Sequence, residues 1–190
     1  RDAVPVYAET ERLCALLADY YPAVDRDLLV AGAILHDLGK IRELTWERVF
    51  DYTDAGRLLG HIALGAMLVE ERIRARPDFP AELATRLLHC ILSHHGELEW
   101  GSPKRPKTLE AIVLHYAENL DGKIAGFLEF SRRSPDPQHP GWTQFNKAMD
   151  RYLYFGTPAD EPAPEDAVPA FLELLPVADD IAAVVRLVGH

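Results

Sequence analysis

The chain has 190 residues, of which 48% are hydrophobic and 26% charged, so it can bury one sizeable core and is not a disordered polypeptide. Its net charge of −10 argues against broad, non-specific binding of nucleic acid, although a bound cation would reverse the charge locally. The longest apolar run, residues 28–35, is too short to span a bilayer, and no signal peptide is visible at the start of the sequence. We therefore expect a cytoplasmic protein without a membrane partner.

The hydrophobic periodicity is helical along most of the chain, which predicts an all-α fold. The first predicted helix ends at Pro22, and its apolar face is formed by Leu13, Leu16, Leu17 and Tyr20. The second runs from Arg26 to about His36, with Asp25 as its N-cap and Gly39 marking its end. The two cysteines, Cys14 and Cys90, lie in apolar helical patterns and are expected to be buried free thiols.

The middle of the chain continues this pattern after an irregular stretch at residues 41–58. Further helices are predicted over residues 59–76 and 81–93, followed by a loop at 94–108 and a long helix over 109–130. The expected apolar side of the long helix consists of Ile112, Val113, Tyr116, Leu120, Ile124, Phe127 and Leu128.

The composition changes after the long helix. Residues 142–155 predict a short amphipathic helix, and residues 157–168 form a linker rich in proline and acidic residues. Residues 169–190 predict a last helix that is apolar enough to need a docking surface, either on its own domain or on a partner chain. We therefore expect a domain over residues 1–156, the linker, and a C-terminal helix through which a homo-oligomer can form.

The most informative motif is the pair His36–Asp37, which follows an apolar run and precedes Gly39 and Lys40. An imidazole and a carboxylate at a helix end can share one divalent cation, or the carboxylate can bridge two. The pair therefore predicts a metal centre that hydrolyses phosphate esters, in which Asp37 positions the nucleophile or helps to move its proton. Lys40 can place its ammonium on a phosphate oxygen; the structural alternative is a lysine that counters the helix dipole.

Ligand-type side chains also lie at the edges of three other apolar segments. His61 follows Gly60 at the start of a helix, whereas His94 and His95 close another. On the long helix, Glu118 and Asp121 are three residues apart and face the same way; the alternative for both is a solvated helix face. His115 is more typical of a hydrogen-bonded core histidine. Mixed imidazole and carboxylate ligands suit manganese, iron, cobalt, nickel or zinc better than magnesium.

A basic island in this acidic chain follows the histidine doublet. Trp100 is followed closely by Lys104, Arg105 and Lys107. The indole can stack on a base and the cations can hold a phosphate, which predicts Trp100 and Lys104 as substrate-binding residues. A proline-stiffened, solvated loop is the alternative on composition.

Four runs of the sequence resemble a known family: LLVAGAILHDLGKIREL, GRLLGHIALG, ILSHHGELEWGSPKRPKTLEA and LHYAENLDGKI. They resemble the HD-domain phosphohydrolase superfamily, an all-α fold that holds one or two metal ions, and are most similar to its YhaM-type 3′–5′ exoribonucleases. The resemblance covers about residues 13–155 and implies an HD domain over residues 1–156. It implies His36 and Asp37 as metal ligands, Lys40 as a phosphate contact, and as ligands or near-ligands of a second metal His61, His94 and His95.

Two positions depart from the superfamily pattern. Val6 stands where the superfamily has a histidine on its first helix, and no histidine precedes His36. Glu118 stands at the superfamily's final aspartate. Its extra methylene still allows it to reach a metal, with Asp121 as the fallback ligand.

These observations favour a metal-dependent phosphodiesterase that acts on RNA 3′ ends or short nucleotides through a metal-activated water. One alternative is a nucleotide phosphohydrolase of other specificity. Another, which Val6 favours, is a degenerate HD domain that binds a nucleotide or a partner without turnover.

Overall fold

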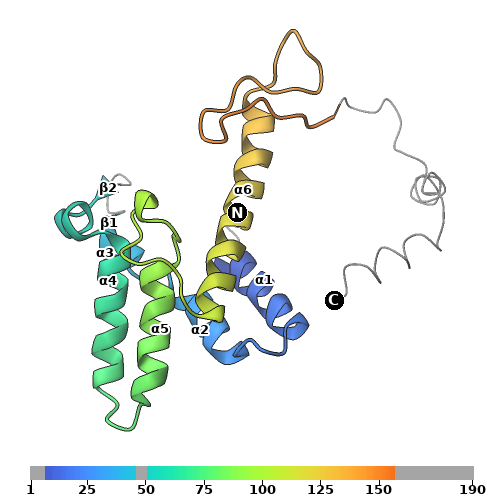
Figure 1. Cartoon of the computed structure of the whole chain (residues 1–190). Coiled ribbons are helices and arrows are strands. Elements are labelled where there is room, and N and C mark those ends of the chain that lie inside the picture. Colours follow the sequence, from blue (N-terminus) through green and yellow to red (C-terminus); the bar gives the residue numbers. More distant parts are fainter. Residues whose placement is uncertain (1–6, 46–50, 157–190) are drawn as a thin grey trace, which may run out of the picture. The chain divides into compact units, whose positions relative to one another are not determined.

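The computed structural model of the protein describes residues 7–45 and 51–156 (Figure 1). Val6, the predicted linker at 157–168 and the predicted last helix at 169–190 lie outside these residues, so the predictions about them stay predictions. The described residues are mainly helical with one two-stranded sheet, which confirms the all-α expectation. The chain divides into two compact units, Arg1–Leu128 and Glu129–His190.

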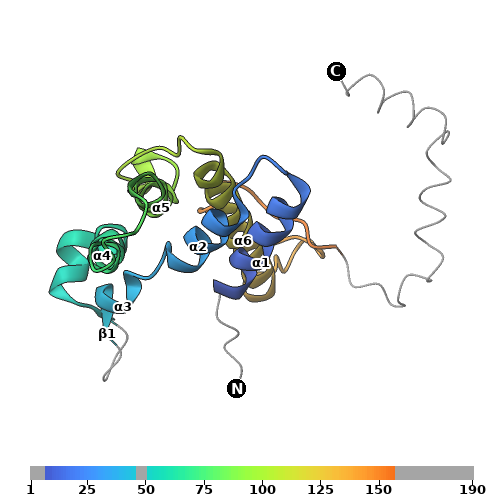
Figure 2. The same ribbon diagram turned by 90° about the horizontal axis from the view of Figure 1, so that it is seen from below.

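Two helices begin the first unit, α1 (Tyr7–Tyr20) and α2 (Arg26–Leu35). Asp25 caps α2, because its side chain accepts a hydrogen bond of 3.1 Å from the backbone N–H of Leu28. Figure 2 shows α2 lying between α1 and α5 (Ala81–Ser93). The core between these helices and the long helix α6 (Leu109–Arg133) is formed by Cys14, Ala18, Val24, Leu29, Ala33, Cys90, Ala111, Leu114 and Ala117. The expectation of two buried free cysteines is confirmed.

In its described parts, residues 41–45 and 51–58, the stretch predicted to be irregular has regular structure, which corrects the expectation there. A short helix α3 (Lys40–Glu43) leads into an antiparallel pair of strands, β1 (Leu44–Thr45) and β2 (Asp51–Tyr52). Helix α4 (Asp54–Arg74) then begins at the N-cap Thr53 and is interrupted at Gly60, whose φ of 72° is not helical. The helix therefore restarts at the residue after Gly60.

Helices α4 and α5 lie side by side in both views (Figures 1 and 2). A second core cluster, which these two helices share with α2, is formed by Leu28, Val69, Leu87 and Ile91. A short 3₁₀ turn (Leu98–Trp100) precedes the long helix α6 (Leu109–Arg133). Among the helices of the described residues, none has the length and apolar character that a membrane crossing requires.

Two predicted helix faces are oriented differently from the expectation. On α1, Leu16 and Tyr20 are exposed, and Cys14 and Ala18 are buried instead. On α6 the expected apolar side is largely exposed, and the buried side combines Leu114 with small and polar residues: Glu110, Ala111, His115 and Ala117. The buried side of α6 is thus the one that bears the functional side chains described below.

The described part of the second unit continues from the end of α6 into extended segments. Residues 142–146 and 151–155 pair through backbone hydrogen bonds, including one of 2.9 Å from the N–H of Thr143 to the oxygen of Leu153. Pro135 pairs with Thr143 on the other side. The predicted helix over residues 142–155 is therefore wrong.

Candidate metal centre

The pair His36–Asp37 lies at the C-terminal end of α2, where both residues are almost fully buried. His36 Nδ1 lies 2.7 Å from the carbonyl oxygen of Ala33, so this nitrogen donates to the helix. The other ring nitrogen, Nε2, lies 3.4 Å from Oδ2 of Asp37. The end of the helix thus presents one imidazole nitrogen and one carboxylate to the same small volume.

His61 reaches this volume from α4. It is the first residue after the Gly60 interruption, and its backbone N–H and Nδ1 both approach Oε1 of Glu43, at 2.9 and 3.2 Å. His61 Nε2 therefore points toward Asp37, 3.4 Å from Oδ1. Gly39 permits this approach, because a Cβ there would overlap the backbone of His61.

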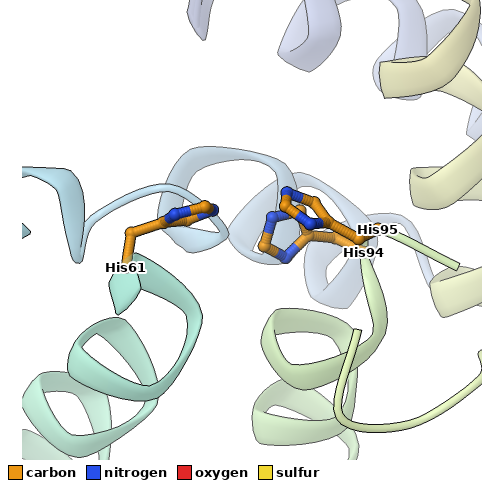
Figure 3. Close-up of side chains that lie close together, drawn as sticks. All are labelled: His61, His94 and His95. Carbon is orange, nitrogen blue, oxygen red and sulfur yellow. The ribbon is translucent and has the colours of Figure 1, made fainter. Parts of the chain in front are cut away.

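His94 and His95 reach the site from the end of α5. His94 Nδ1 lies 2.7 Å from the oxygen of Ile91, and His95 Nδ1 lies 3.0 Å from the oxygen of Trp100. Figure 3 shows these two imidazoles facing that of His61. In all three residues Nδ1 is engaged by an oxygen acceptor, an arrangement that orients the opposite nitrogen of metal-binding histidines.

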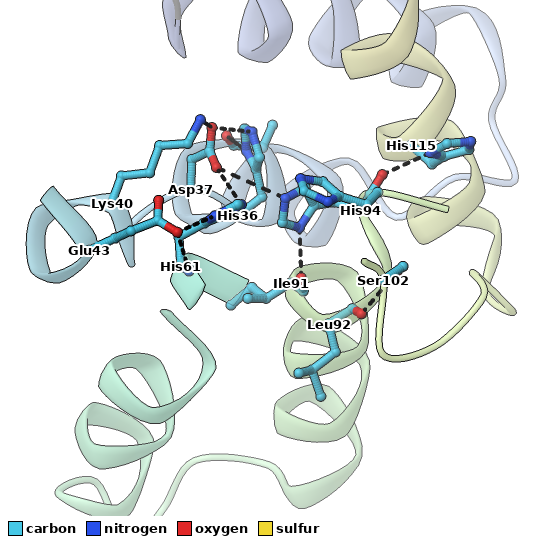
Figure 4. A network of polar contacts seen from close by, with 12 residues as sticks. His36, Asp37, Lys40, Glu43, His61, Ile91, Leu92, His94, Ser102 and His115 are labelled. Carbon is cyan, nitrogen blue, oxygen red and sulfur yellow. Dashed lines mark hydrogen bonds and ion pairs between the residues drawn. The ribbon is translucent and has the colours of Figure 1, made fainter. Parts of the chain in front are cut away.

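The predicted ligands form two adjacent groups. In each group one nitrogen or oxygen per residue lies within 4.8 Å of those of the other members. The first group consists of His36, Asp37 and Glu118, and the second of His61, His94 and His95. Asp37 joins them, because its Oδ1 lies 3.4 Å from Nε2 of His61 and 3.9 Å from Nε2 of His94 (Figure 4).

Three buried polar atoms at this junction have no hydrogen-bond partner among the described residues: Asp37 Oδ1, His61 Nε2 and His94 Nε2. Leaving such a group unsatisfied costs about 1–3 kcal/mol. A divalent cation would accept all three as ligands, and imidazole with carboxylate is a donor set that transition metals favour. The side chains present therefore fit a metal ion.

The pKa shifts of the candidate ligands do not all have the same direction: those of His94 and Asp37 favour the forms that bind metal, whereas those of His36 and Glu118 are raised. Burial and then the neighbouring His36 lower the pKa of His94 to about 3, so its imidazole is neutral near neutral pH. Burial opposes ionisation of Asp37, but the hydrogen bonds and charges of His36 and Lys40 outweigh it and hold the pKa of Asp37 well below its usual range. Burial raises the pKa of Glu118 to about 7.

The two acids of the long helix that were predicted as candidate ligands differ in their surroundings. Glu118 belongs to the group with His36 and Asp37. Asp121 belongs to neither group and accepts a hydrogen bond of 3.3 Å from Oγ1 of Thr10 on α1. Glu118 is therefore the carboxylate of α6 that the geometry brings to the site.

A pocket of about 270 Å³ adjoins the second group, and it is lined by His94, His95, Trp100, His115, Glu118 and Asn119. The indole of Trp100 lies 6.0 Å from the ring of His115. His115 is buried and its Nδ1 lies 2.8 Å from the oxygen of His94, as expected of a hydrogen-bonded core histidine. The structure thus places Trp100 beside the ligand groups.

The other two residues predicted to contact the substrate, Lys40 and Lys104, do not line this pocket. The ammonium of Lys40 pairs with Oδ2 of Asp37 and its side chain is partly exposed. Lys104 is exposed and does not line the pocket. Arg105 forms an ion pair with Glu97 at 2.8 Å, which neutralises part of the positive charge of the basic island.

Two residues of the site were not singled out from the sequence. Glu43 orients His61, and Asn119 lines the pocket. Glu43 lies in a polar stretch where nothing distinguishes an acid that becomes buried from a solvated one. Asn119 could have been flagged only as the neighbour of Glu118.

Comparison with known families gives a match to the HD domain over residues 8–123, which includes every member of both ligand groups. The chain belongs to the HD domain family. This confirms the resemblance read from the HDLGK and SHHG motifs.

Curated relatives of this HD domain are named 3′–5′ exoribonuclease YhaM. The protein from Bacillus velezensis is 51% identical over 114 residues, which cover 59% of this chain and 35% of the relative. Those from Bacillus subtilis and Bacillus pumilus are 50% and 46% identical, with the same coverage. The chain thus spans about a third of the length of these relatives. No solved structure matches it significantly.

Proposed function

We propose that this HD domain is a metal-dependent phosphodiesterase that acts on the 3′ ends of RNA or on short nucleotides. The observation that carries the proposal is the meeting of the two ligand groups at Asp37, with three buried atoms left for a cation. The YhaM relatives, named as exoribonucleases and about half identical over the HD region, favour RNA among phosphodiester substrates.

The six ligand-type residues are assigned to two metal positions. His36, Asp37 and Glu118 would hold one cation, and His61, His94 and His95 would hold the other. A bound divalent cation lowers the pKa of water and offsets the charge of the phosphate oxygens. Manganese, iron, cobalt, nickel and zinc suit these ligands better than magnesium.

The residues around the ligands orient and bind. Oδ2 of Asp37 accepts a hydrogen bond from the ammonium of Lys40, which leaves its Oδ1 directed toward the histidines. Because Lys40 is partly exposed, its ammonium is assigned as a contact to a phosphate oxygen of the substrate. Its role is to attract and position the phosphate.

The pocket beside His95 is assigned to the nucleoside next to the cleaved phosphate. Trp100 offers an indole face for stacking, and the amide of Asn119 offers a donor and an acceptor. Lys104 is assigned to a phosphate further along the strand, outside the pocket.

A second candidate function is a nucleotide-binding HD domain without turnover. It is favoured by the sequence, since Val6 replaces the histidine that the superfamily places on its first helix. A nucleotide phosphohydrolase of other specificity is a third reading of the same ligand groups. The experiment below distinguishes these three.

The test combines elemental analysis with a substrate screen on the purified chain. We expect bound transition metal, cleavage of bis-p-nitrophenyl phosphate, and stepwise shortening of a 5′-labelled RNA from its 3′ end. Asp37→Ala should abolish metal binding and both activities. Metal binding without any cleavage would support the nucleotide-binding domain without turnover. Cleavage of mononucleotides alone would support the nucleotide phosphohydrolase of other specificity. Full activity in Asp37→Ala would refute the metal assignment.

A further inference from the structure

The second unit carries an aromatic face that the metal centre does not use. Residues 142–146 and 151–155 are paired and extended, so alternate side chains point to opposite faces. Thr143 and Leu153 are buried on one face. On the other face Trp142, Tyr152 and Tyr154 are 43%, 58% and 55% exposed. Large rings held half-exposed on extended segments form a surface suited to stacking.

These rings are held in place by the backbone that carries them. Trp142 and Tyr154 are directly paired residues, with ring centroids 5.0 Å apart. Tyr152 packs edge-on against Phe145 at 5.3 Å. Behind them, Oγ1 of the buried Thr143 accepts a hydrogen bond of 3.1 Å from the N–H of Leu153. The face is therefore ordered before any ligand arrives.

The same face borders a pocket of about 460 Å³, lined by Asp136, Gln138, His139, Trp142 and Tyr152. Its size lies in the range of about 300–1,000 Å³ typical of small-ligand sites. Asp136 accepts hydrogen bonds from the N–H of Gln138 at 2.8 Å and from Nδ1 of His139 at 3.0 Å. With Nδ1 donating, Nε2 of a neutral His139 is an acceptor, and the amide of Gln138 supplies a donor and an acceptor.

The local charge differs from that of the whole chain. Residues 129–156 contain four lysines and arginines against three acidic residues, whereas the whole chain carries −10. Lys147 and Arg151 are exposed and form no ion pair within the described part of the chain. Exposed cations in the same segment as exposed rings suit a ligand that combines flat bases with phosphates.

We propose that this aromatic pocket binds a base of single-stranded RNA by stacking on Trp142 and Tyr152, with His139 and Gln138 contacting the edge of the base. The choice of RNA rests on the proposed function. Every base has a π-face, so stacking of this kind holds successive residues of a strand with little sequence preference. Duplex RNA, whose bases are already stacked and paired, would be excluded.

The test measures binding of the whole chain to short fluorescent single-stranded RNA in EDTA, where metal-dependent cleavage cannot occur. Trp142→Ala and Tyr152→Ala should each weaken binding roughly tenfold, which is the usual cost of losing one stacking ring. Trp142→Phe should retain most of the affinity, because it keeps an aromatic face. Since Tyr20 is exposed and packs on Tyr21 but lies on α1, Tyr20→Ala is the matched control and should bind as the wild type does.

Three results would overturn the proposal. The first is wild-type affinity in both alanine variants when their thermal melts show intact folding. The second is equal competition by duplex RNA or by an abasic strand, which would assign binding to charge alone. The third is a changed oligomeric state in Trp142→Ala with unchanged RNA affinity, which would make the face a protein interface. Because binding is measured in EDTA, a failure of the proposed hydrolysis does not affect the result.

Discussion

A single carboxylate oxygen of Glu43 accepts both the backbone N–H and the Nδ1–H of His61, at 2.9 and 3.2 Å (Figure 4). Glu43 therefore caps the N-terminus of the second segment of α4 and orients the side chain of His61, its first residue. With Nδ1 engaged, His61 Nε2 is directed at Oδ1 of Asp37. An acidic partner of this kind also increases the basicity of a histidine ligand.

Replacing this partner should weaken metal binding without removing a ligand. We expect Glu43→Gln to lower the affinity for a transition metal about 10–100-fold, measured by competition with a chelator, because the charge that supports His61 is lost. Glu70→Gln is the matched control, since Glu70 pairs with Arg74 on the exposed side of α4, the helix that carries His61. Equal affinities in the two variants would show that Glu43 does not support the site.

The turn after the His36–Asp37 pair has no room for a side chain. A Cβ at Gly39 would overlap the backbone of His61 and of Gly65. Gly39→Ala should therefore cost at least about 1–3 kcal/mol of unfolding free energy, measured by denaturant titration. Gly122→Ala, in an open position within α6, should instead raise stability by about 0.5–1 kcal/mol, because alanine is the better helix former. Equal stability of the two variants would contradict this packing.

Glu118 and Asp121 offer a matched pair of acids on one helix. Glu118→Gln should reduce the metal content of the purified protein, because a carboxylate of the first ligand group is lost. Asp121→Asn should retain full metal content, because the amide oxygen still accepts the hydrogen bond from Thr10. Elemental analysis of both purified variants measures their metal content. The reverse result would make Asp121 the ligand that the superfamily pattern requires.

The sequence predicted the helices and their order well, because strong periodicity and capping residues such as Asp25 are local signals. It failed where burial depends on tertiary context. Most of the α6 residues predicted to form its buried apolar side are exposed, while Glu110 and His115 are buried. Residues 142–155 were predicted as a helix because the segment is too short for its two-residue alternation to stand out.

The candidate ligands could be found from sequence because each stands at a helix end beside apolar residues. That His61 and His94 face the same oxygen of Asp37 could not be found, since it depends on the packing of α4 and α5 against α2. Glu43 was missed for the same reason. The candidate ligands stand in local motifs, whereas the orientation of each candidate is set by contacts distant in sequence.

The two cysteines should be inert in the native protein. Cys14 and Cys90 are fully buried, and burial raises the pKa of each thiol to about 12. Because the thiolate is the reactive species, we expect no rapid reaction with a disulfide reagent at pH 8. Both thiols should react at once in denaturant. Rapid labelling of either cysteine in the folded protein would contradict the packing around α1, α2 and α5.

Glu118 should make the stability of the metal-free protein depend on pH. Its pKa is about 7 in the folded chain, against an ordinary value of 4.5. Between these values the folded state holds a proton that the unfolded state has released, so stability falls as pH rises through this window and stays lower above it. The Glu118→Gln variant has no ionisable group at this position, so its stability should not show this decrease.

Thermal melts of EDTA-treated protein at several pH values test this dependence. The wild type should match Glu118→Gln near pH 4 and be the less stable of the two at pH 8. Adding metal at pH 8 should reverse that order, because the ionised carboxylate then has a cation to bind. Parallel pH profiles in the absence of metal would show that Glu118 is not held in the buried environment described here.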